Sequence, residues 1–325
     1  TDHMQITFTA QTRAELLPSD PPAEPLQPHQ VAGRTLYSVI SSGTELAVYQ
    51  GHHGASFPTG TGYAAVFEVT DVGADVTTLA PGDRAFCMGN HRSWQRSGET
   101  ETLRVPPGLN PEKAGLARLM GVTMSTLTTT TARPPALVMV TGLGVIGLLG
   151  AQNFRAAGYE VIACDPDPAR RDFAAATCGL TVYPEPPPDL AGQVALALEC
   201  SGHEAAALAA CNMVRKRGEV VLVGVPWIAT TDLTAHTLLH AIFHKYAVVR
   251  SGWEWEVPRQ PTDFQQGSIF GNIAGALRWL DEGRVQVDGL YQVMSPRDCQ
   301  AAYQGLLTHT LPRPAVVFDW SSADQ

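Results

Sequence analysis

The stretch Val138-Met139-Val140-Thr141-Gly142-Leu143-Gly144-Val145-Ile146-Gly147 gives the strongest structural signal in the 325-residue chain. An alanine-rich run follows it, and a second apolar run, residues 160–164, then ends in Asp165. This order indicates a strand, a glycine turn, a helix and a second strand. In a dinucleotide site the first glycine allows the turn, the second lets a pyrophosphate approach the backbone, and the third lets the helix pack on the strand. We therefore predict that a cofactor is bound by Gly142, Leu143, Gly144, Val145, Ile146 and Gly147.

Asp165 decides which cofactor the sequence favours. It follows Gly142 by about 23 residues, where a carboxylate accepts hydrogen bonds from a ribose 2′-hydroxyl. A carboxylate there would repel the 2′-phosphate of NADP, so NAD is favoured. Arg170 and Arg171 follow closely and could serve a phosphate, which leaves NADP possible.

Composition and charge limit the possible partners. The chain is 44% hydrophobic and 16% charged, with a formal net charge of −9, which argues against a nucleic-acid partner. It shows no apolar run long enough for a membrane span and no signal peptide, so we expect a cytoplasmic protein that acts on a small molecule. The six cysteines are scattered, which predicts reduced thiols.

Two patterns of residues divide the chain. Residues from about 5 to 112 carry short β-like runs broken by Gly, Pro, Asp and Asn, whereas residues 118–252 alternate strand-like and helix-like runs. A helix-like run, about 264–282, and a final β-like run follow. We predict an α/β protein in which residues 118–252 form a Rossmann domain, a doubly wound parallel sheet. Residues 1–117 and 253–325 are predicted to form a discontinuous β-rich domain.

The chain resembles the medium-chain dehydrogenase/reductase superfamily. The resemblance depends on the domain order, the Gly-Leu-Gly-Val-Ile-Gly motif, Ser201-Gly202-His203-Glu204, and Val39-Ile40-Ser41-Ser42-Gly43-Thr44-Glu45, which is similar to the family's Gly-Ile-Cys-Gly-Thr-Asp. It implies a GroES-like catalytic domain beside the Rossmann domain. It also implies hydride transfer between a nicotinamide and a secondary alcohol or ketone, such as a polyol or cyclitol, and a homodimer joined through the edges of two Rossmann sheets.

The chain departs from the zinc-dependent members of that superfamily. By this resemblance Ser42 stands at the position of the ligating cysteine, Gly60 at that of the histidine, and Val122 or a neighbour at that of the third ligand. Glycine and valine side chains offer no lone pair to a metal. We therefore predict that the protein binds no zinc.

Without a metal, hydrogen-bond donors must stabilise the charge that develops on the substrate oxygen. The predicted catalytic residues are Thr44, which matches the hydroxyl that relays the substrate proton in the family, Ser42, Tyr63 and His52. His53 and His91 are further candidates, because imidazole titrates near working pH. Each has a structural alternative: Thr44 as a capping residue, the histidines as surface or core residues, and Glu45 as a residue that bonds the turn.

Further cofactor contacts are predicted on the helix and strand ends. Thr126 matches a position that lies on the nicotinamide side in the family, although it also belongs to a threonine-rich helix. Cys200, Ser201, Gly224 and Val225 end the fourth and fifth strands, the edge where open α/β sheets bind ligands; their glycines could equally be ordinary turns.

Two other functions fit the sequence. One is an NADPH-dependent quinone or enoyl reductase that acts on an activated C=C bond, which Asp165 disfavours. The other is a non-catalytic dinucleotide-binding protein.

Overall fold

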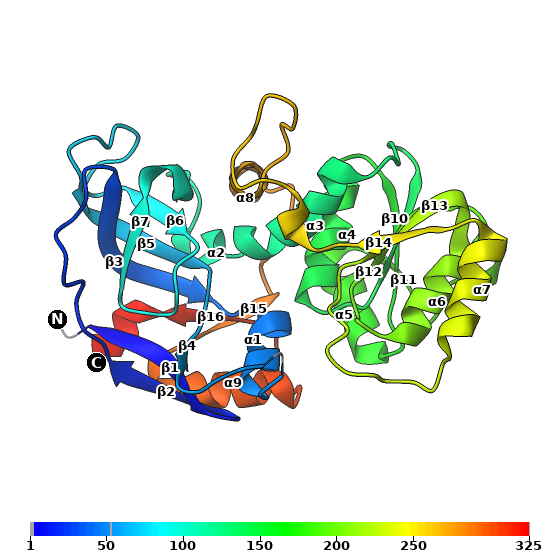
Figure 1. The fold of residues 1–325 in the computed structure, drawn as a ribbon, viewed down its shortest axis with the longest axis horizontal. Coiled ribbons are helices and arrows are strands. Elements are labelled where there is room, and N and C mark those ends of the chain that lie inside the picture. Colours follow the sequence, from blue (N-terminus) through cyan, green and yellow to red (C-terminus); the bar gives the residue numbers. More distant parts are fainter. Residues whose placement is uncertain (1–2, 53, 325) are drawn as a thin grey trace. The chain divides into compact units, whose positions relative to one another are not determined.

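A computed structural model describes residues 3–52 and 54–324 of the chain (Figure 1). The chain forms two compact units. The β-rich unit comprises Thr1–Arg118, Ala274–Gly283 and Val287–Gln325. The parallel-sheet unit comprises Leu119–Ile273 and Arg284–Gln286.

The parallel-sheet unit contains six parallel strands in the order β11-β10-β9-β12-β13-β14. Counted along the chain this is the order 3-2-1-4-5-6 of a Rossmann sheet, whose strand order reverses between β9 and β12. The predicted fold class is confirmed for this unit. The strands are β9 (Leu137–Thr141), β10 (Glu160–Cys164), β11 (Thr181–Tyr183), β12 (Val194–Glu199), β13 (Val214–Leu222) and β14 (Val248–Ser251).

Helices cover both faces of this sheet (Figure 1). One pair, α4 and α5, connects the first half of the strands, and the other pair, α6 and α7, connects the second half on the opposite face. Ala210, Cys211 and Ala241 pack from the second pair onto the sheet residues Met139 and Val220. The helices of this unit are α4 (Val145–Ala156), α5 (Pro168–Cys178), α6 (Glu204–Met213) and α7 (Ala235–Lys245). Two more helices cross the division between the units: α3 (Ala117–Thr129) lies in this unit from Leu119, and α8 (Ile269–Asp281) lies in it as far as Ile273.

The β-rich unit contains a three-stranded sheet and a seven-stranded sheet. The pairs are antiparallel except β15 with β16. The strands are β1 (Met4–Ala10), β2 (Arg13–Pro18), β3 (Gln30–Val39), β4 (Thr59–Gly60), β5 (Ala65–Val72), β6 (Arg84–Cys87), β7 (Trp94–Gly98), β8 (Thr102–Arg104), β15 (Tyr291–Met294) and β16 (Ala315–Asp319). Its helices are α1 (Ser42–Tyr49), α2 (Pro111–Ala114) and α9 (Cys299–Leu307). Short 3₁₀ turns in the chain lie at Glu99–Glu101, Pro188–Leu190, Glu254–Glu256, Pro296–Asp298 and Trp320–Asp324.

An aromatic cluster forms the core beside the smaller sheet of the β-rich unit. The rings of Phe8 and Tyr303 meet edge to face with centroids 4.8 Å apart, and Tyr49 stacks on Tyr303 at 5.6 Å. Phe318 of β16 packs into the same cluster. The last strand, β16, therefore packs into the same core as the first strand, β1. This explains why the chain returns to the β-rich unit at its C-terminal end.

The division of the chain differs from the predicted boundary at residue 253. Residues 253–273 group with the parallel-sheet unit. Glu256 accepts hydrogen bonds from Arg250 at 3.1 Å and from Thr129 at 3.2 Å, and these contacts hold the segment after β14 on that unit. The sequence analysis assigned this segment to the β-rich domain, but its contacts are with the parallel-sheet unit.

Several predicted elements also have different bounds in the structure. The segment around Thr44, expected to be a turn, is the first turn of α1. The expected helix of about 264–282 begins only at Ile269, and Phe264 lies fully exposed in the preceding loop. Among the helices that the structure describes, none is both long and apolar enough to cross a membrane.

Candidate functional site

The glycine turn after β9 has the geometry that its sequence predicts. Gly142 has φ +86°, which favours glycine, and its N–H donates to the Cys164 carbonyl at 2.9 Å. A Cβ on Gly147 would lie 1.8 Å from the Gly142 carbonyl oxygen, so only glycine lets α4 approach the turn this closely. A Cβ on Gly144 would meet nothing within 4 Å. The backbone before α4 therefore has open space in front of it.

This arrangement fits a dinucleotide pyrophosphate. Gly144 is the N-cap of α4 and supplies no side chain, so the N–H groups of the first helical turn are available to an anion. Thr126 on α3 adds a second feature: its side chain is fully buried, and its hydroxyl has no hydrogen-bond partner among the described residues. A buried polar group of this kind is costly unless a ligand or water satisfies it.

The Asp165 carboxylate bonds to the protein backbone in the structure, whereas the sequence predicts a bond to a ribose. Its side chain is only 4% exposed. One carboxylate oxygen accepts from the Leu143 N–H at 2.8 Å and the other from the Asp167 N–H at 2.9 Å. Arg170 approaches the first oxygen at 3.7 Å. In this structure Asp165 therefore braces the glycine turn, and its contact with a ribose stays a prediction.

The loops that end β9, β12 and β13 meet at one edge of the sheet, as predicted for Cys200, Ser201 and Gly224. A Cβ on Gly142 would lie 2.8 Å from the Ser201 nitrogen, and one on Gly224 would lie 2.3 Å from the Gly202 nitrogen. Val225 follows and is 47% exposed. Burial, and to a lesser extent the nearby acid at the end of β12, raises the pKa of the Cys200 thiol, so this cysteine stays protonated at neutral pH.

Glu199 organises this edge, and the sequence analysis did not single it out. The side chain is 1% exposed, and its carboxylate accepts from the Ser201 N–H at 2.7 Å, the Ser201 hydroxyl and the Gly202 N–H at 2.9 Å. The available signal was an acidic residue at the end of an otherwise apolar strand. Such a residue must satisfy its charge locally, because a buried carboxylate without donors is costly.

A second group of predicted residues gathers in the β-rich unit around Tyr63. The Tyr63 hydroxyl donates to the Ser41 hydroxyl oxygen and is also hydrogen-bonded by the exposed Thr44 hydroxyl. The Arg118 guanidinium lies over the Tyr63 ring, 4.8 Å from its centroid. The structure therefore brings the predicted Thr44 and Tyr63 together and adds two residues that sequence reasoning missed, Ser41 and Arg118.

Buried Glu45 holds the turn that carries this group. One oxygen accepts from the Ser41 N–H at 2.8 Å, which confirms the expected bond to the turn. The other accepts from the Thr61 hydroxyl at 2.8 Å and the Tyr303 hydroxyl at 2.5 Å, and His91 Nε2 lies 3.1 Å away. Burial works to raise the pKa of Glu45, but His91 and these hydrogen bonds outweigh it and lower the pKa below its ordinary value. The carboxylate is therefore charged at neutral pH.

The candidate histidines differ in what the structure shows of them. His91 is fully buried between Glu45 and the Ser38 hydroxyl, 2.7 Å from Nδ1, so it is a core residue. His52 is half-buried and lies just after α1, where its backbone N–H donates to the Ala47 carbonyl at 2.8 Å. His53 lies outside the described residues.

The positions expected to have lost metal ligands lie on three different elements. Ser42 is half-buried in α1, next to Ser41 in the chain. Gly60 pairs with Thr7 in β4, and a Cβ there would meet Gln5, so Tyr63 rather than Gly60 reaches the Ser41 turn. Val122 is half-buried in α3. Across residues 3–52 and 54–324, no three His, Cys, Asp or Glu side chains gather in a way that could hold a metal.

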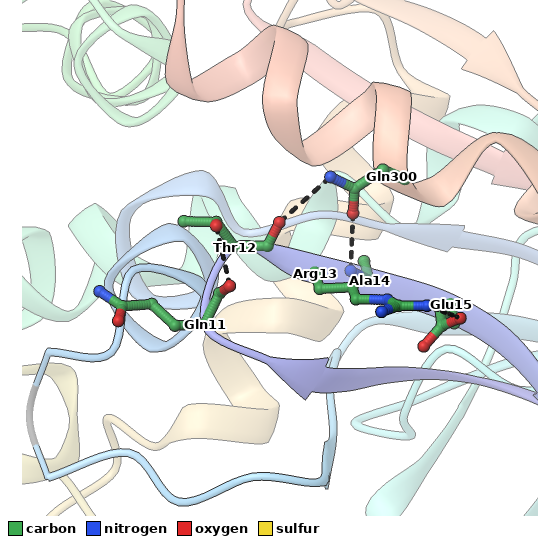
Figure 2. Close-up of a pocket in the computed structure, with 6 residues that line it drawn as sticks. All are labelled: Gln11, Thr12, Arg13, Ala14, Glu15 and Gln300. Atoms are coloured by element: carbon green, nitrogen blue, oxygen red, sulfur yellow. Dashed lines mark hydrogen bonds and ion pairs between the residues drawn. The ribbon is translucent and has the colours of Figure 1, made fainter.

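A surface hollow of the β-rich unit lies elsewhere, at the turn between β1 and β2 (Figure 2). Gln300 of α9 donates to the Thr12 carbonyl at 3.1 Å and accepts from the Ala14 N–H at 2.7 Å, and Arg13 pairs with Glu15 at 3.0 Å (Figure 2). These polar groups bond one another, so we interpret the hollow as a braced turn. None of the predicted site residues lines it.

Comparisons with known proteins point to one group. The family described as "Zinc-binding dehydrogenase" matches residues 145–254. The sorbitol dehydrogenase of Halalkalibacterium halodurans is 26% identical over 272 residues, which cover 69% of this chain and 75% of that protein.

Two solved structures share the fold over nearly the whole chain. Galactitol-1-phosphate dehydrogenase from Escherichia coli superposes with a TM-score of 0.82 at 17% identity, covering 97% of this chain and 99% of that one. A putative zinc-binding dehydrogenase from Sinorhizobium meliloti, bound to NADP, gives a TM-score of 0.78 at 16% identity and covers 98% of this chain and 99% of that one. At these identities the structures establish the shared fold.

The lowered pKa of Glu45 predicts an acid-sensitive stability. The folded state favours the charged Glu45 carboxylate. Its contribution to the free energy of unfolding is therefore complete above the pKa of the unfolded state, about 4.5, and is lost as the pH falls through the lower pKa of the folded state. Glu45→Gln should lower the free energy of unfolding by roughly 3 kcal/mol at neutral pH, since it breaks a buried charged network. Urea unfolding between neutral and acid pH should show this difference shrinking toward acid.

Glu24→Gln is the matched control, because Glu24 is an exposed acid of the same unit. It should change the stability little at any pH. A difference between wild type and Glu45→Gln that stays constant across the whole pH range would contradict the role given to the Glu45 charge.

Proposed function

Because the chain belongs to the medium-chain dehydrogenase/reductase superfamily, we propose that it is a nicotinamide-dependent oxidoreductase that works without zinc on a secondary alcohol or the corresponding ketone. A polyol or cyclitol is the substrate class that we favour. The observation that carries the proposal is the Tyr63 group, in which hydroxyls stand at the turn where the resemblance predicts metal ligands.

The parallel-sheet unit is assigned the cofactor. The N–H groups after Gly144 and the buried Thr126 hydroxyl fit a dinucleotide, and Asp165 favours NAD over NADP. Bound nicotinamide would supply the hydride acceptor for oxidation and the hydride donor for reduction. NADP remains the alternative, because the Arg170 side chain is 39% exposed beside Asp165 and could meet a 2′-phosphate.

Tyr63 is assigned the substrate oxygen. In reduction its O–H gives its proton to the carbonyl oxygen. In oxidation the phenol first releases its own proton to solvent through Thr44, and the tyrosinate then takes the alcohol proton. Thr44 is exposed and hydrogen-bonded to Tyr63, so it can pass this proton to and from solvent. In the structure Ser41 accepts the Tyr63 O–H. When that O–H turns to a substrate oxygen, the Ser41 hydroxyl can instead donate to the phenol oxygen and keep it oriented. Ser42 follows Ser41 in the chain, and we assign no catalytic step to Ser42 or to His52.

The donor set explains why we propose no zinc. Protein zinc sites use thiolate, imidazole and carboxylate ligands. At the Ser41 turn the side chains are hydroxyls and a guanidinium, and the carboxylate of Glu45 is occupied by four donors of the protein. These groups do not fit zinc, and no step is assigned to a metal.

The function can be tested with purified protein, NAD or NADP, and a panel of polyols, cyclitols and other secondary alcohols. We expect alcohol-dependent formation of NADH that survives dialysis against a chelator. Tyr63→Phe should lower kcat about 10²- to 10³-fold, because it removes the donor to the substrate oxygen, with the Kd for NAD unchanged.

Tyr49→Phe is the control, since Tyr49 is a buried tyrosine of the same unit that bonds Gln300 and Gln304. It should keep kcat. Reduction of quinones or enones alone would support the C=C reductase, and cofactor binding without turnover on any panel would support the non-catalytic alternative. One zinc per chain retained after dialysis, or full activity of Tyr63→Phe, would refute the mechanism.

The cofactor assignment depends on Asp165. Asp165→Ser removes a charge-assisted acceptor for the ribose, worth about 1.5–3 kcal/mol, so the Kd for NAD should rise roughly ten- to a hundredfold. The preference for NAD over NADP should narrow or reverse, and kcat at saturating cofactor should change much less.

Asp167→Ser separates this effect from a general loss of charge. Asp167 caps α5 in the same loop, and serine is also a good N-cap, so this variant should keep the helix and the cofactor preference. Equal dissociation constants for wild type and Asp165→Ser would refute the ribose contact.

We also propose a homodimer in which β14 of one chain pairs with β14 of a second copy. β14 is the outer strand of the parallel sheet, and an open strand edge is a template for pairing. The preceding helix α7 exposes Leu239 (62%) and Phe243 (79%), which a partner would cover. The neighbouring strand β13 lies inside the sheet, between β12 and β14, so it offers no open edge.

Light scattering should therefore give twice the chain mass of 34.8 kDa. Phe243→Glu should shift the mass toward the monomer, because it places a charge in the covered surface. Phe264→Glu is the control, since Phe264 is exposed in a loop of the same unit, away from α7 in sequence. A wild type that stays monomeric at all concentrations would exclude the dimer.

A further inference from the structure

Arg118 is a buried cation that faces the proposed acid–base group. It lies in the first turn of α3, and its side chain is only 3% exposed. The guanidinium carbon is 4.8 Å from the centroid of the Tyr63 ring. At this distance a guanidinium is attracted to the ring face, and its planar shape suits stacking.

Four groups of the β-rich unit act on the Tyr63 phenol. Burial raises the pKa of Tyr63, and the charge of Glu45 acts in the same direction. The hydrogen bonds that Tyr63 shares with Ser41 and Thr44, and the positive charge of Arg118, lower the pKa. Glu45 in turn lies 3.1 Å from His91 Nε2. Arg118 is thus the cation in this set that opposes the cost of forming a buried tyrosinate.

Resting on the function proposed for Tyr63, we propose that Arg118 is a positioning residue that makes Tyr63 a competent proton donor and acceptor. When Tyr63 gives its proton to the substrate oxygen, the phenol O–H bond breaks, an O–H bond forms on the product, and the tyrosinate takes a proton back from solvent through Thr44. The negative charge of the tyrosinate spreads into the ring, directly under the guanidinium. Arginine stays charged throughout, so it stabilises this state without exchanging a proton itself.

This role suits a site that holds hydroxyls where a metal would otherwise stand. A metal stabilises an oxyanion by its fixed positive charge. In this site the fixed positive charge is the Arg118 guanidinium. It acts on the Tyr63 phenol, which donates to the substrate oxygen, and not on that oxygen directly. Because the guanidinium is buried, its field is screened less than that of an exposed arginine.

The alternative is that Arg118 only packs α3 against the loop of Tyr63. The two roles differ in what happens to the titration of the phenol. We therefore propose measuring tyrosinate formation by ultraviolet difference spectroscopy in wild type, Arg118→Gln and Arg118→Lys. Each protein is compared with the same protein carrying Tyr63→Phe, so that the difference isolates Tyr63 from the other tyrosines.

Loss of the cation in Arg118→Gln should raise the pKa of Tyr63 by about one to two units. The alkaline limb of the kcat profile should move by the same amount, and kcat at neutral pH should fall about tenfold or more with KM little changed. Arg118→Lys keeps the charge and should restore most of the wild-type titration. If Arg118→Gln does not fold, Arg118→Met takes its place, because it fills the stem volume without a charge.

Arg92→Gln is the matched control, because Arg92 makes a similar contact over the Trp94 ring of the same unit, at 3.9 Å. It should leave the Tyr63 titration unchanged. An unchanged Tyr63 titration in Arg118→Gln or Arg118→Met, or a shift that Arg118→Lys does not restore, would overturn the proposal. If Tyr63→Phe keeps full activity while the pKa of Tyr63 still depends on Arg118, the effect of Arg118 on the phenol stands and the function proposed for Tyr63 is wrong.

Discussion

The β-rich unit depends on the buried carboxylate of Glu45. It joins α1 to Thr61, to Tyr303 of α9 and to His91, segments that are far apart in the sequence. A buried charge is stable only when its surroundings supply donors, and here four groups do so. Burial and the charge of Glu45 raise the pKa of Tyr303 well above its usual value, so Tyr303 remains a donor. The turn that carries Ser41 and Thr44 is held in place by this network.

A different constraint organises the parallel-sheet unit. The close approach of Gly147 to the Gly142 carbonyl brings α4 onto β9, and this leaves the helix N-terminus open in front of Gly144. Two buried acids then fix the loops beside it, Asp165 on the glycine turn and Glu199 on the loop after β12. The edge of the sheet is thus rigid before any ligand binds, which reduces the ordering cost of binding.

The two units divide the proposed chemistry in a way that their side chains explain. The parallel-sheet unit offers backbone donors and a buried hydroxyl, which suit phosphates and a ribose. The β-rich unit offers a phenol, a serine and a threonine with a guanidinium over the phenol ring, which suit proton transfer to a substrate oxygen. A site made of hydroxyls lacks the charge of a metal, so neighbouring residues must orient the hydroxyl groups. In the proposed mechanism Ser41, Glu45 and Arg118 have this role.

The sequence by itself determined the parallel-sheet unit and the glycine turn at its edge. The spacing of Gly142, Gly144 and Gly147 permits one local geometry, and the alternation of strands and helices then dictates the order of the sheet, since both signals act between residues close in the chain. The tertiary structure decided the rest. Tyr63, Ser41 and Arg118 meet only because β-rich pairings and the Glu45 network bring distant segments together, and no local pattern encodes a contact across 55 residues, the separation of Tyr63 and Arg118 (118 − 63). For the same reason the sequence identified Asp165 as an acid at a strand end, but only the fold showed that its oxygens bond the Leu143 and Asp167 N–H groups.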